Sequence, residues 1–178
     1  MDQLNNHIIR FLLNTAIPCK KYKSNKENLK LYSAIRRAHR DVLAGRWYLK
    51  KYCSISDKII EFLYSEIQNS NEMLNSSDLI NSITREYPGV NFGAVQKLVN
   101  MTLKYIIILN AFDDDFNIAV DIKRCDCPLD SIILEKLGRS DVKWTSITSD
   151  KYKEMQELIS NRLSNDKGNI YYDFENWE

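Results

Sequence analysis

Two lysines lie within the most apolar segment of the chain, residues 92–111, where a charge needs a physical reason. Lys97, Asn100 and Lys104 are spaced i, i+3 and i+7, so a helix would carry them in a line down one side. Charged side chains are rarely buried without a partner. A lysine in apolar surroundings loses proton affinity, and its neutral amine can then act as a nucleophile. The alternative for Lys97 is a side chain that extends its charge into solvent.

A carboxylate with two compatible roles stands at the start of a later apolar segment. Asp130 follows a proline, and the segment that it opens ends at Leu137-Gly138. Aspartate in this position is a common helix N-cap. The same carboxylate could stabilise developing positive charge or activate a nucleophile.

These two regions read Asn91-Phe92-Gly93-Ala94-Val95-Gln96-Lys97 and Cys127-Pro128-Leu129-Asp130-Ser131-Ile132-Ile133-Leu134-Glu135-Lys136-Leu137-Gly138. Together they resemble the helix-hairpin-helix DNA glycosylase superfamily. In that superfamily a glycine-containing hairpin leads into a helix bearing the catalytic lysine, and a later helix opens with the catalytic aspartate. The resemblance covers residues 76–138 and implies that Lys97 and Asp130 are the catalytic pair. Their 33-residue separation is similar to that in the archaeal 8-oxoguanine DNA glycosylase branch.

The hairpin itself departs from the superfamily pattern, which usually has two glycines two residues apart. Here Gly93 is followed by Val95 at the second position. An alternative register places the hairpin at residues 88–90, but Gly93 then takes the place of the lysine. We therefore expect the hairpin at Gly93. By resemblance, the backbone amides of Phe92, Gly93, Ala94 and Val95 would bind a DNA phosphate.

The chemistry of such a pair follows from its side chains. Breaking an N-glycosidic bond builds positive charge on the deoxyribose ring, which a carboxylate beside C1′ stabilises. If the neutral amine of Lys97 attacks C1′, the resulting imine permits β-elimination and strand nicking, an AP-lyase activity. If it does not, a water activated by Asp130 releases the base alone. Either route requires the target base to leave the stack and enter a pocket.

The charge distribution favours a polyanionic partner. The chain has a net charge of only +1, yet residues 20–51 contain 11 lysines and arginines against two acidic residues. Clustered basic residues of this kind are typical of nucleic-acid binding, although they also occur on solvated helix faces. We expect phosphate contacts from Arg36, Arg40 and Lys104, with a carboxylate as the alternative partner of Lys104. The base pocket would be lined by Trp47, Tyr48, Tyr105 and Trp144.

Helical periodicity dominates the elements that must position these residues. The helices expected are 4–17, 28–43, 46–53 after a kink at Gly45, a helix starting at Ser56 and Asp57 and reaching Ile67, 76–86, 92–111, 130–137 and 149–163. The tail from residue 170 could pack on the body or form a short strand. The fold class is all-α, in one domain spanning residues 1–178. By resemblance, the domain has two helical lobes with an active cleft between them.

Composition limits the other possibilities. Five glycines and three prolines are too few for an all-β chain with tight turns. The longest apolar run, residues 105–109, is short for a membrane span, and the N-terminus lacks a secretory signal pattern. Four cysteines and two histidines have no metal-ligand spacing, so we expect reduced thiols, no metal and no cofactor. We therefore expect a cytoplasmic monomer without a membrane partner.

The sequence thus predicts a DNA glycosylase acting on double-stranded DNA. Its substrate would be an oxidised purine such as 8-oxoguanine, or a hypermodified phage base such as glucosylated hydroxymethylcytosine in antiviral defence. The alternative is a non-catalytic helical module that binds nucleic acid or protein.

Overall fold

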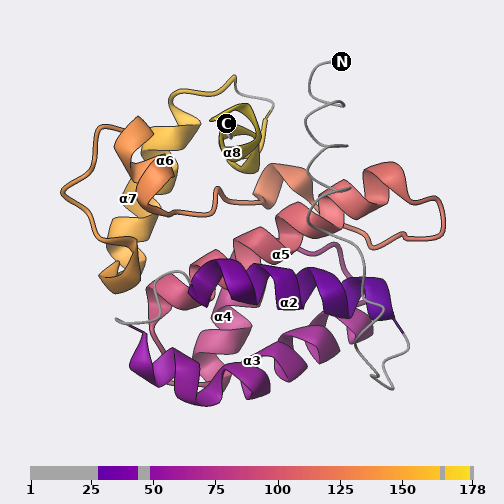
Figure 1. Cartoon of the computed structure of the whole chain (residues 1–178). Coiled ribbons are helices and arrows are strands. Elements are labelled where there is room, and N and C mark those ends of the chain that lie inside the picture. The colour runs from indigo at the N-terminus through magenta and orange to yellow at the C-terminus, as the bar shows by residue number, and fades with distance from the viewer. Residues whose placement is uncertain (1–27, 44–48, 165–166, 177–178) are drawn as a thin grey trace.

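The computed structural model describes residues 28–43, 49–164 and 167–176. Its helices are α2 (Leu29–Leu43), α3 (Lys50–Asn69), α4 (Ser76–Glu86), α5 (Phe92–Phe112), α6 (Ser131–Lys136), α7 (Ser149–Ser160) and α8 (Ile170–Asn176), with 3₁₀ turns η2 (Ile122–Arg124) and η3 (Trp144–Ser146) (Figure 1). In this part of the chain, β pairing is limited to an isolated bridge between Leu74 and Val120. The predicted all-α class is confirmed.

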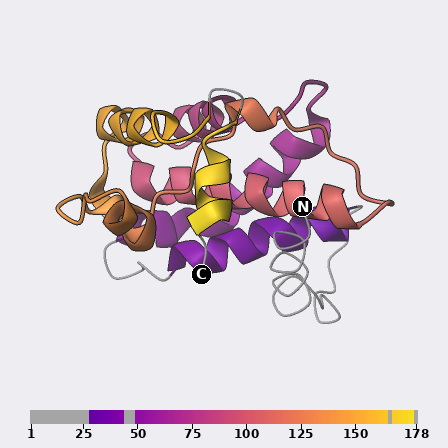
Figure 2. The same cartoon turned by 90° about the horizontal axis from the view of Figure 1, so that it is seen from above.

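Helix α5 is the core around which the other elements are arranged. It packs against α2, α4 and η3, and it runs through the interior in both views of the fold (Figures 1 and 2). Leu98, Leu103 and Ile106 are fully buried on it. Among the described residues, α5 alone has the length and hydropathy to cross a membrane, yet 83% of its most apolar window is buried in the fold. This extent of burial is characteristic of a core helix.

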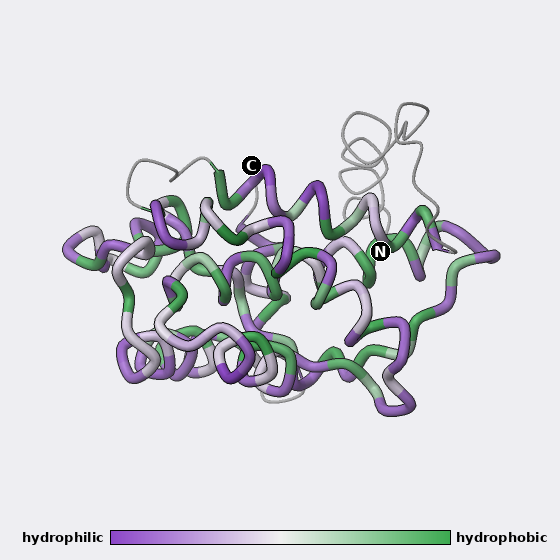
Figure 3. Tube along the Cα trace, turned by 90° about the horizontal axis from the view of Figure 1, so that it is seen from below, coloured by the Kyte–Doolittle hydropathy of each residue, from purple (hydrophilic) through white to green (hydrophobic). Residues whose placement is uncertain are grey.

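The helices that cover α5 are amphipathic. Leu31, Ile35 and Val42 are fully buried along one stripe of α2, as its spacing predicts. The described segments carry hydrophobic and hydrophilic residues in alternation (Figure 3). Burial of these stripes supplies most of the stability of such helices.

Side-chain caps fix where several helices begin. Asn75, Asn91, Asp130 and Thr148 each accept a hydrogen bond from a backbone N–H in the first turn of the helix that follows. The boundaries predicted for α4, α5 and α6 therefore agree with the structure to within a residue or two.

Helix α7 ends at Ser160, three residues before its predicted end, and two further predictions are wrong. No helix begins at Ser56, because α3 is continuous from Lys50 and the Ser56 hydroxyl donates to the carbonyl of Cys53 in its own helix. The tail from Ile170 is a helix that packs on the body, so the strand alternative is also wrong. The predicted helix at 4–17 and the kink at Gly45 lie outside the described residues.

Gly93 occupies the first turn of α5, where the backbone of η3 passes directly over it. A Cβ atom added at Gly93 would lie 1.9 Å from the carbonyl oxygen of Trp144. Glycine therefore permits a close backbone contact here, rather than an unusual dihedral angle.

We expect Gly93→Ala to lower the free energy of unfolding by about 1–3 kcal/mol, because one of the two backbones must move. The gain in helix propensity, about 1 kcal/mol at most, is too small to offset this clash. Urea denaturation followed by circular dichroism measures the change. Asn81→Ala, on the exposed face of α4, is the control and should change stability by about 0.5 kcal/mol or less. An equal effect of the two substitutions would contradict the close contact.

Candidate active site

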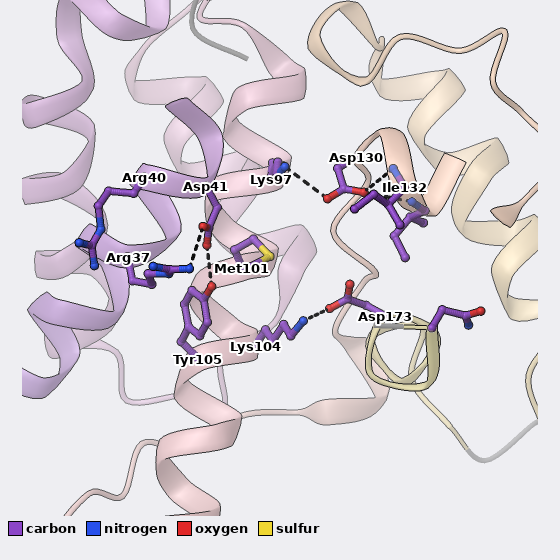
Figure 4. Close-up of a pocket in the computed structure, with 12 residues that line it drawn as sticks. Arg37, Arg40, Asp41, Lys97, Met101, Lys104, Tyr105, Asp130, Ile132 and Asp173 are labelled. Carbon is purple, nitrogen blue, oxygen red and sulfur yellow. Dashed lines mark hydrogen bonds and ion pairs between the residues drawn. The ribbon is translucent and has the colours of Figure 1, made fainter. Parts of the chain in front are cut away.

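The two predicted catalytic residues lie opposite each other. Lys97 is on α5 and Asp130 caps α6, and Lys97 Nζ is 3.4 Å from Asp130 Oδ2 (Figure 4). The other oxygen of Asp130, Oδ1, accepts hydrogen bonds of 3.0 Å from the amides of Ile132 and Ile133. Asp130 therefore caps its helix with one oxygen and presents the other to the lysine. The lysine side chain is 8% exposed and the aspartate side chain 27% exposed, so the carboxylate is the more accessible of the two.

This pair lines a cavity of about 320 Å³, at the lower end of the range usual for small-molecule sites. Helices α2, α5 and α8 and the start of α6 contribute its walls (Figure 4). Its lining residues are Arg37, Arg40, Asp41, Lys97, Met101, Lys104, Tyr105, Asp130, Ile132, Ile133, Asp173 and Asn176. Polar groups thus converge on the cavity from elements far apart in the sequence.

Trp144 covers the lysine from η3. The centroid of its ring is 4.6 Å from Lys97 Nζ, within the range of a cation–π contact. Trp144 is half-buried and belongs to the turn that packs on Gly93. The close passage of η3 over α5 therefore places an aromatic ring on the amine.

Tyr105 contributes a hydrogen-bonded group to the wall of the same cavity. Its hydroxyl donates to Asp41 Oδ2 at 2.6 Å, and Asp41 Oδ1 is 3.6 Å from Arg37. Burial and the neighbouring Asp41 carboxylate raise the pKa of Tyr105, so the phenol stays protonated. The predicted pocket residue Tyr105 thus lines the cavity together with two α2 residues that the sequence did not single out. Trp144, also predicted for the pocket, contacts Lys97 but is not among the residues that line the cavity. Trp47 and Tyr48 lie outside the described residues.

Lys104 was predicted to contact a phosphate or a carboxylate, and the structure pairs it with a carboxylate. It is 2% exposed, and its Nζ lies 2.5 Å from Asp173 Oδ2 on α8. Burial raises the pKa of Asp173, and the Lys104 ammonium opposes that rise. Lys104 is therefore held in a buried ion pair that attaches α8 to α5.

The polar line on α5 has a physical explanation. Each of its members reaches a different partner outside the helix: Lys97 reaches Asp130, Asn100 reaches the Tyr152 hydroxyl at 2.7 Å, and Lys104 reaches Asp173. Buried polar groups are tolerated when they are paired in this way.

The turn between α4 and α5 lies at residues 87–91, which corrects the hairpin position predicted at Gly93. Gly89 has a φ of +72° in this turn, a conformation that favours glycine. The amides of Ala94 and Val95 already donate to Asn91, and Gly93 is covered by η3. Partly buried Phe92 packs edge-to-face on Tyr152. Residues 92–95, whose amides were predicted to bind a phosphate, begin the buried helix α5, and the turn precedes them. In this register Gly93 falls where the superfamily has its lysine, so the candidacy of Lys97 rests on its approach to Asp130.

The two arginines predicted to bind DNA differ in their surroundings. Arg36 forms an ion pair with Asp57 at 2.9 Å. Arg40 is exposed and lines the cavity, and no ion pair to it is found among the residues that the structure describes. Of the predicted phosphate contacts, Arg40 and Lys104 line the cavity beside the catalytic candidates, and Arg40 is the exposed one.

Two buried glutamines hold the segment that leads to Asp130. Gln96 Oε1 accepts from the N–H of Leu129 at 3.1 Å, and its Nε2 donates to the Leu129 carbonyl at 2.9 Å. Gln156 on α7 makes the same pair of bonds with Cys127, at 3.0 and 2.8 Å. Each glutamine side chain thus makes the two backbone hydrogen bonds that a neighbouring β-strand would otherwise make. We call these two pairings the glutamine clamps.

A third set of polar contacts fixes the start of this segment. The Tyr152 hydroxyl donates to Asp126 Oδ2 at 2.8 Å and accepts from Asn100 Nδ2. The amide of Asp126 donates to the Ser76 hydroxyl, at the start of α4. Burial raises the pKa of Asp126, and the hydrogen bond from Tyr152 opposes that rise.

Among the described residues, no group of three or more His, Cys, Asp or Glu side chains is placed to hold a metal ion. Cys125 and Cys127 are buried free thiols. Burial raises the pKa of Cys125 to about 12, so this thiol stays protonated and unreactive. The residues that line the cavity include the amines of Lys97 and Lys104 and the carboxylates of Asp41, Asp130 and Asp173.

No family model, curated protein or solved structure compared with this chain matches it.

Sequence reasoning missed several residues of the site. Arg37, Asp41 and Asp173 reach the cavity from helices at opposite ends of the chain, and their spacing carries no signal of this. Gln156 has no distinctive neighbour in the sequence. Gln96 did have a signal, because a glutamine next to a lysine in an apolar helix is as unexpected as the lysine itself.

The raised pKa of Asp126 predicts how stability depends on pH. Because its pKa in the folded protein lies above the unfolded value, the wild type loses stability as pH rises through the interval between them. Asp126→Asn keeps an acceptor for Tyr152 but cannot ionise. We expect the variant to be more stable than the wild type at pH 8, by about 1.4 kcal/mol for each unit by which folding raises the pKa. This difference should vanish near pH 4.

Urea denaturation across this pH range tests the prediction. Asp114→Asn, on an exposed turn, is the control and should follow the wild-type profile. A difference between Asp126→Asn and wild type that does not change with pH would contradict a buried, titrating carboxyl group at residue 126.

Proposed function

We propose that this protein is a DNA glycosylase of the helix-hairpin-helix type, in which two helical lobes enclose the cavity as an active cleft. The observation that carries the proposal is the approach of Lys97 Nζ to Asp130 Oδ2, 3.4 Å, at the wall of an open cavity. Residues 33 positions apart supply an amine and a carboxylate to one place, as the resemblance in sequence implies. If Lys97 and Asp130 were two unrelated surface residues, nothing would require their side chains to lie this close together.

Asp130 has the arrangement that stabilisation of a sugar cation needs. Its Oδ1 is fixed by two backbone amides, so the carboxylate has little freedom to turn. Its Oδ2 points toward the amine of Lys97, and both residues line the cavity (Figure 4). A fixed negative charge requires little reorganisation as positive charge develops at C1′ of the deoxyribose. We assign Asp130 to this electrostatic role.

Lys97 is the proposed nucleophile. Its amine must lose a proton before it attacks C1′, and the Asp130 carboxylate is within reach to accept that proton. The lysine side chain is 8% exposed, and its amine lies beside the Asp130 carboxylate and the Trp144 ring. If the charged form predominates in the complex with DNA, a water activated by Asp130 takes over, and base release occurs without strand nicking.

The cavity would receive the base after it leaves the stack. Tyr105, Met101 and Ile132 supply apolar surface in the cavity, while Asp41 and Arg37 supply hydrogen-bonding groups. Exposed Arg40 at the cavity would contact a phosphate of the flipped nucleotide. The proposed substrates remain an oxidised purine such as 8-oxoguanine, or a hypermodified phage base such as glucosylated hydroxymethylcytosine, the latter in antiviral defence.

The first prediction of the proposed function concerns Asp130. We expect Asp130→Asn to reduce base release by at least about 100-fold, because the amide caps α6 but carries no charge. DNA affinity should be retained. Duplexes carrying different oxidised and modified bases, glucosylated cytosines included, are incubated with the protein, and the freed bases are analysed by mass spectrometry. If the wild type releases no base from any duplex while still binding DNA, the protein is a non-catalytic nucleic-acid binder instead.

The second prediction concerns Lys97. We expect borohydride to trap a covalent adduct between the protein and DNA in the wild type, and no adduct in Lys97→Gln. Lys143→Gln, which changes an exposed lysine just before η3, is the matched control and should still be trapped. Gel electrophoresis of the reduced mixture detects the adduct. Base release from wild type without an adduct would assign the attack to water.

A further inference from the structure

Gln96 and Leu129 are joined in a way that places the two proposed catalytic residues relative to each other. Gln96 is fully buried, and its amide group bonds both the N–H and the carbonyl of Leu129. Its Nε2 also donates to the Gly93 carbonyl at 3.1 Å, and its Oε1 also accepts from the Asn100 amide at 3.5 Å. All four polar positions of this amide are therefore occupied, which fixes its orientation.

The Gln96 clamp lies next to both proposed catalytic residues in the sequence. Gln96 immediately precedes Lys97, and Leu129 immediately precedes Asp130. The clamp thus joins α5 to the segment before α6, at the residues next to Lys97 and Asp130. The Asp130 carboxylate is further fixed by its capping bonds, so the clamp and the cap together determine where Oδ2 lies.

We infer that Gln96 is a positioning residue, which holds Asp130 at the distance from Lys97 that base excision requires. This inference rests on the proposed function. Displacement of a reacting group by about 1 Å can reduce a rate by about 100-fold. A small shift of Leu129 would be transmitted directly to Asp130, because no residue separates them.

Gln156 provides a matched control for this inference. It clamps Cys127 with the same two bonds and is also buried, at 6% exposure. Its bonds end three residues before Asp130, with Leu129 and the Gln96 clamp in between. A substitution at Gln156 should therefore loosen the same segment and leave the carboxylate in place.

Glutamate is the informative substitution at both positions. A protonated glutamic acid has the shape of glutamine, accepts through its carbonyl oxygen and donates through its hydroxyl. The ionised form cannot donate, and in Gln96→Glu it would face the carbonyls of Leu129 and Gly93. Burial and these carbonyls should raise the pKa of the new carboxyl. The Gln96 clamp would then be intact at low pH and broken at high pH.

The experiment measures single-turnover base release at saturating protein from pH 5.5 to 8.5, under conditions where circular dichroism shows each variant folded. We expect Gln96→Glu to lose about 100-fold in rate at pH 8.5 and to recover toward the wild-type rate at pH 5.5, with DNA affinity unchanged. Gln156→Glu should show a similar pH-dependent loss of stability but keep the wild-type rate profile. The ratio of each variant to wild type removes the protein's own pH dependence.

The outcomes separate the two proposals. If the wild type releases base and Gln96→Glu keeps the wild-type rate at every pH, the positioning role is wrong and the glycosylase proposal stands. If Gln156→Glu loses rate as much as Gln96→Glu does, the clamps only stabilise the fold and the inference is also overturned. If the wild type releases no base from any duplex tested, both proposals fall.

Discussion

Two buried amide side chains hold an extended piece of backbone inside a helical protein, and the geometry of the site depends on this. Within the described part of the chain no strand pairs with residues 127–129, so their backbone N–H and carbonyl groups need other partners. Gln96 and Gln156 supply those partners at Leu129 and Cys127. An unpaired buried backbone group costs roughly 1–3 kcal/mol, so loss of either glutamine would affect the whole segment. The helix that begins at Asp130 starts from a point fixed in this way.

The same demand for partners explains why the core helix tolerates polar residues. Lys97, Asn100 and Lys104 would each be unfavourable in an apolar interior if they were alone. Each instead connects α5 to a different part of the chain: the start of α6, α7 and α8. Replacement of one partner in such a pair leaves the other charge buried, which costs far more than the pair contributes. The polar line therefore fixes the relative placement of these elements in addition to any chemical role.

Much of this fold could be predicted from the sequence, because helix periodicity and capping residues are local signals. Asp130, for example, was recognised both as an N-cap and as a catalytic candidate, and it occupies the capping position. The start of α3 was missed since Ser56 and Asp57 suit a cap equally well, and only packing shows that the helix continues through them. The partners of Lys104 and Gln96 could not be predicted. They lie 69 and 33 residues away, and no periodicity relates residues across a connector.

The pairing of Lys104 with Asp173 has a consequence for the order in which the protein can be completed. The cavity needs walls from both α2 and α8, which lie near opposite ends of the described chain. During synthesis, helices α2 to α5 can pack together before α8 emerges, because they contact one another and all precede it in the chain. Lys104 meets its carboxylate partner Asp173 only when this last helix arrives. Docking of α8 is therefore the step at which a nascent chain completes the wall of the cavity.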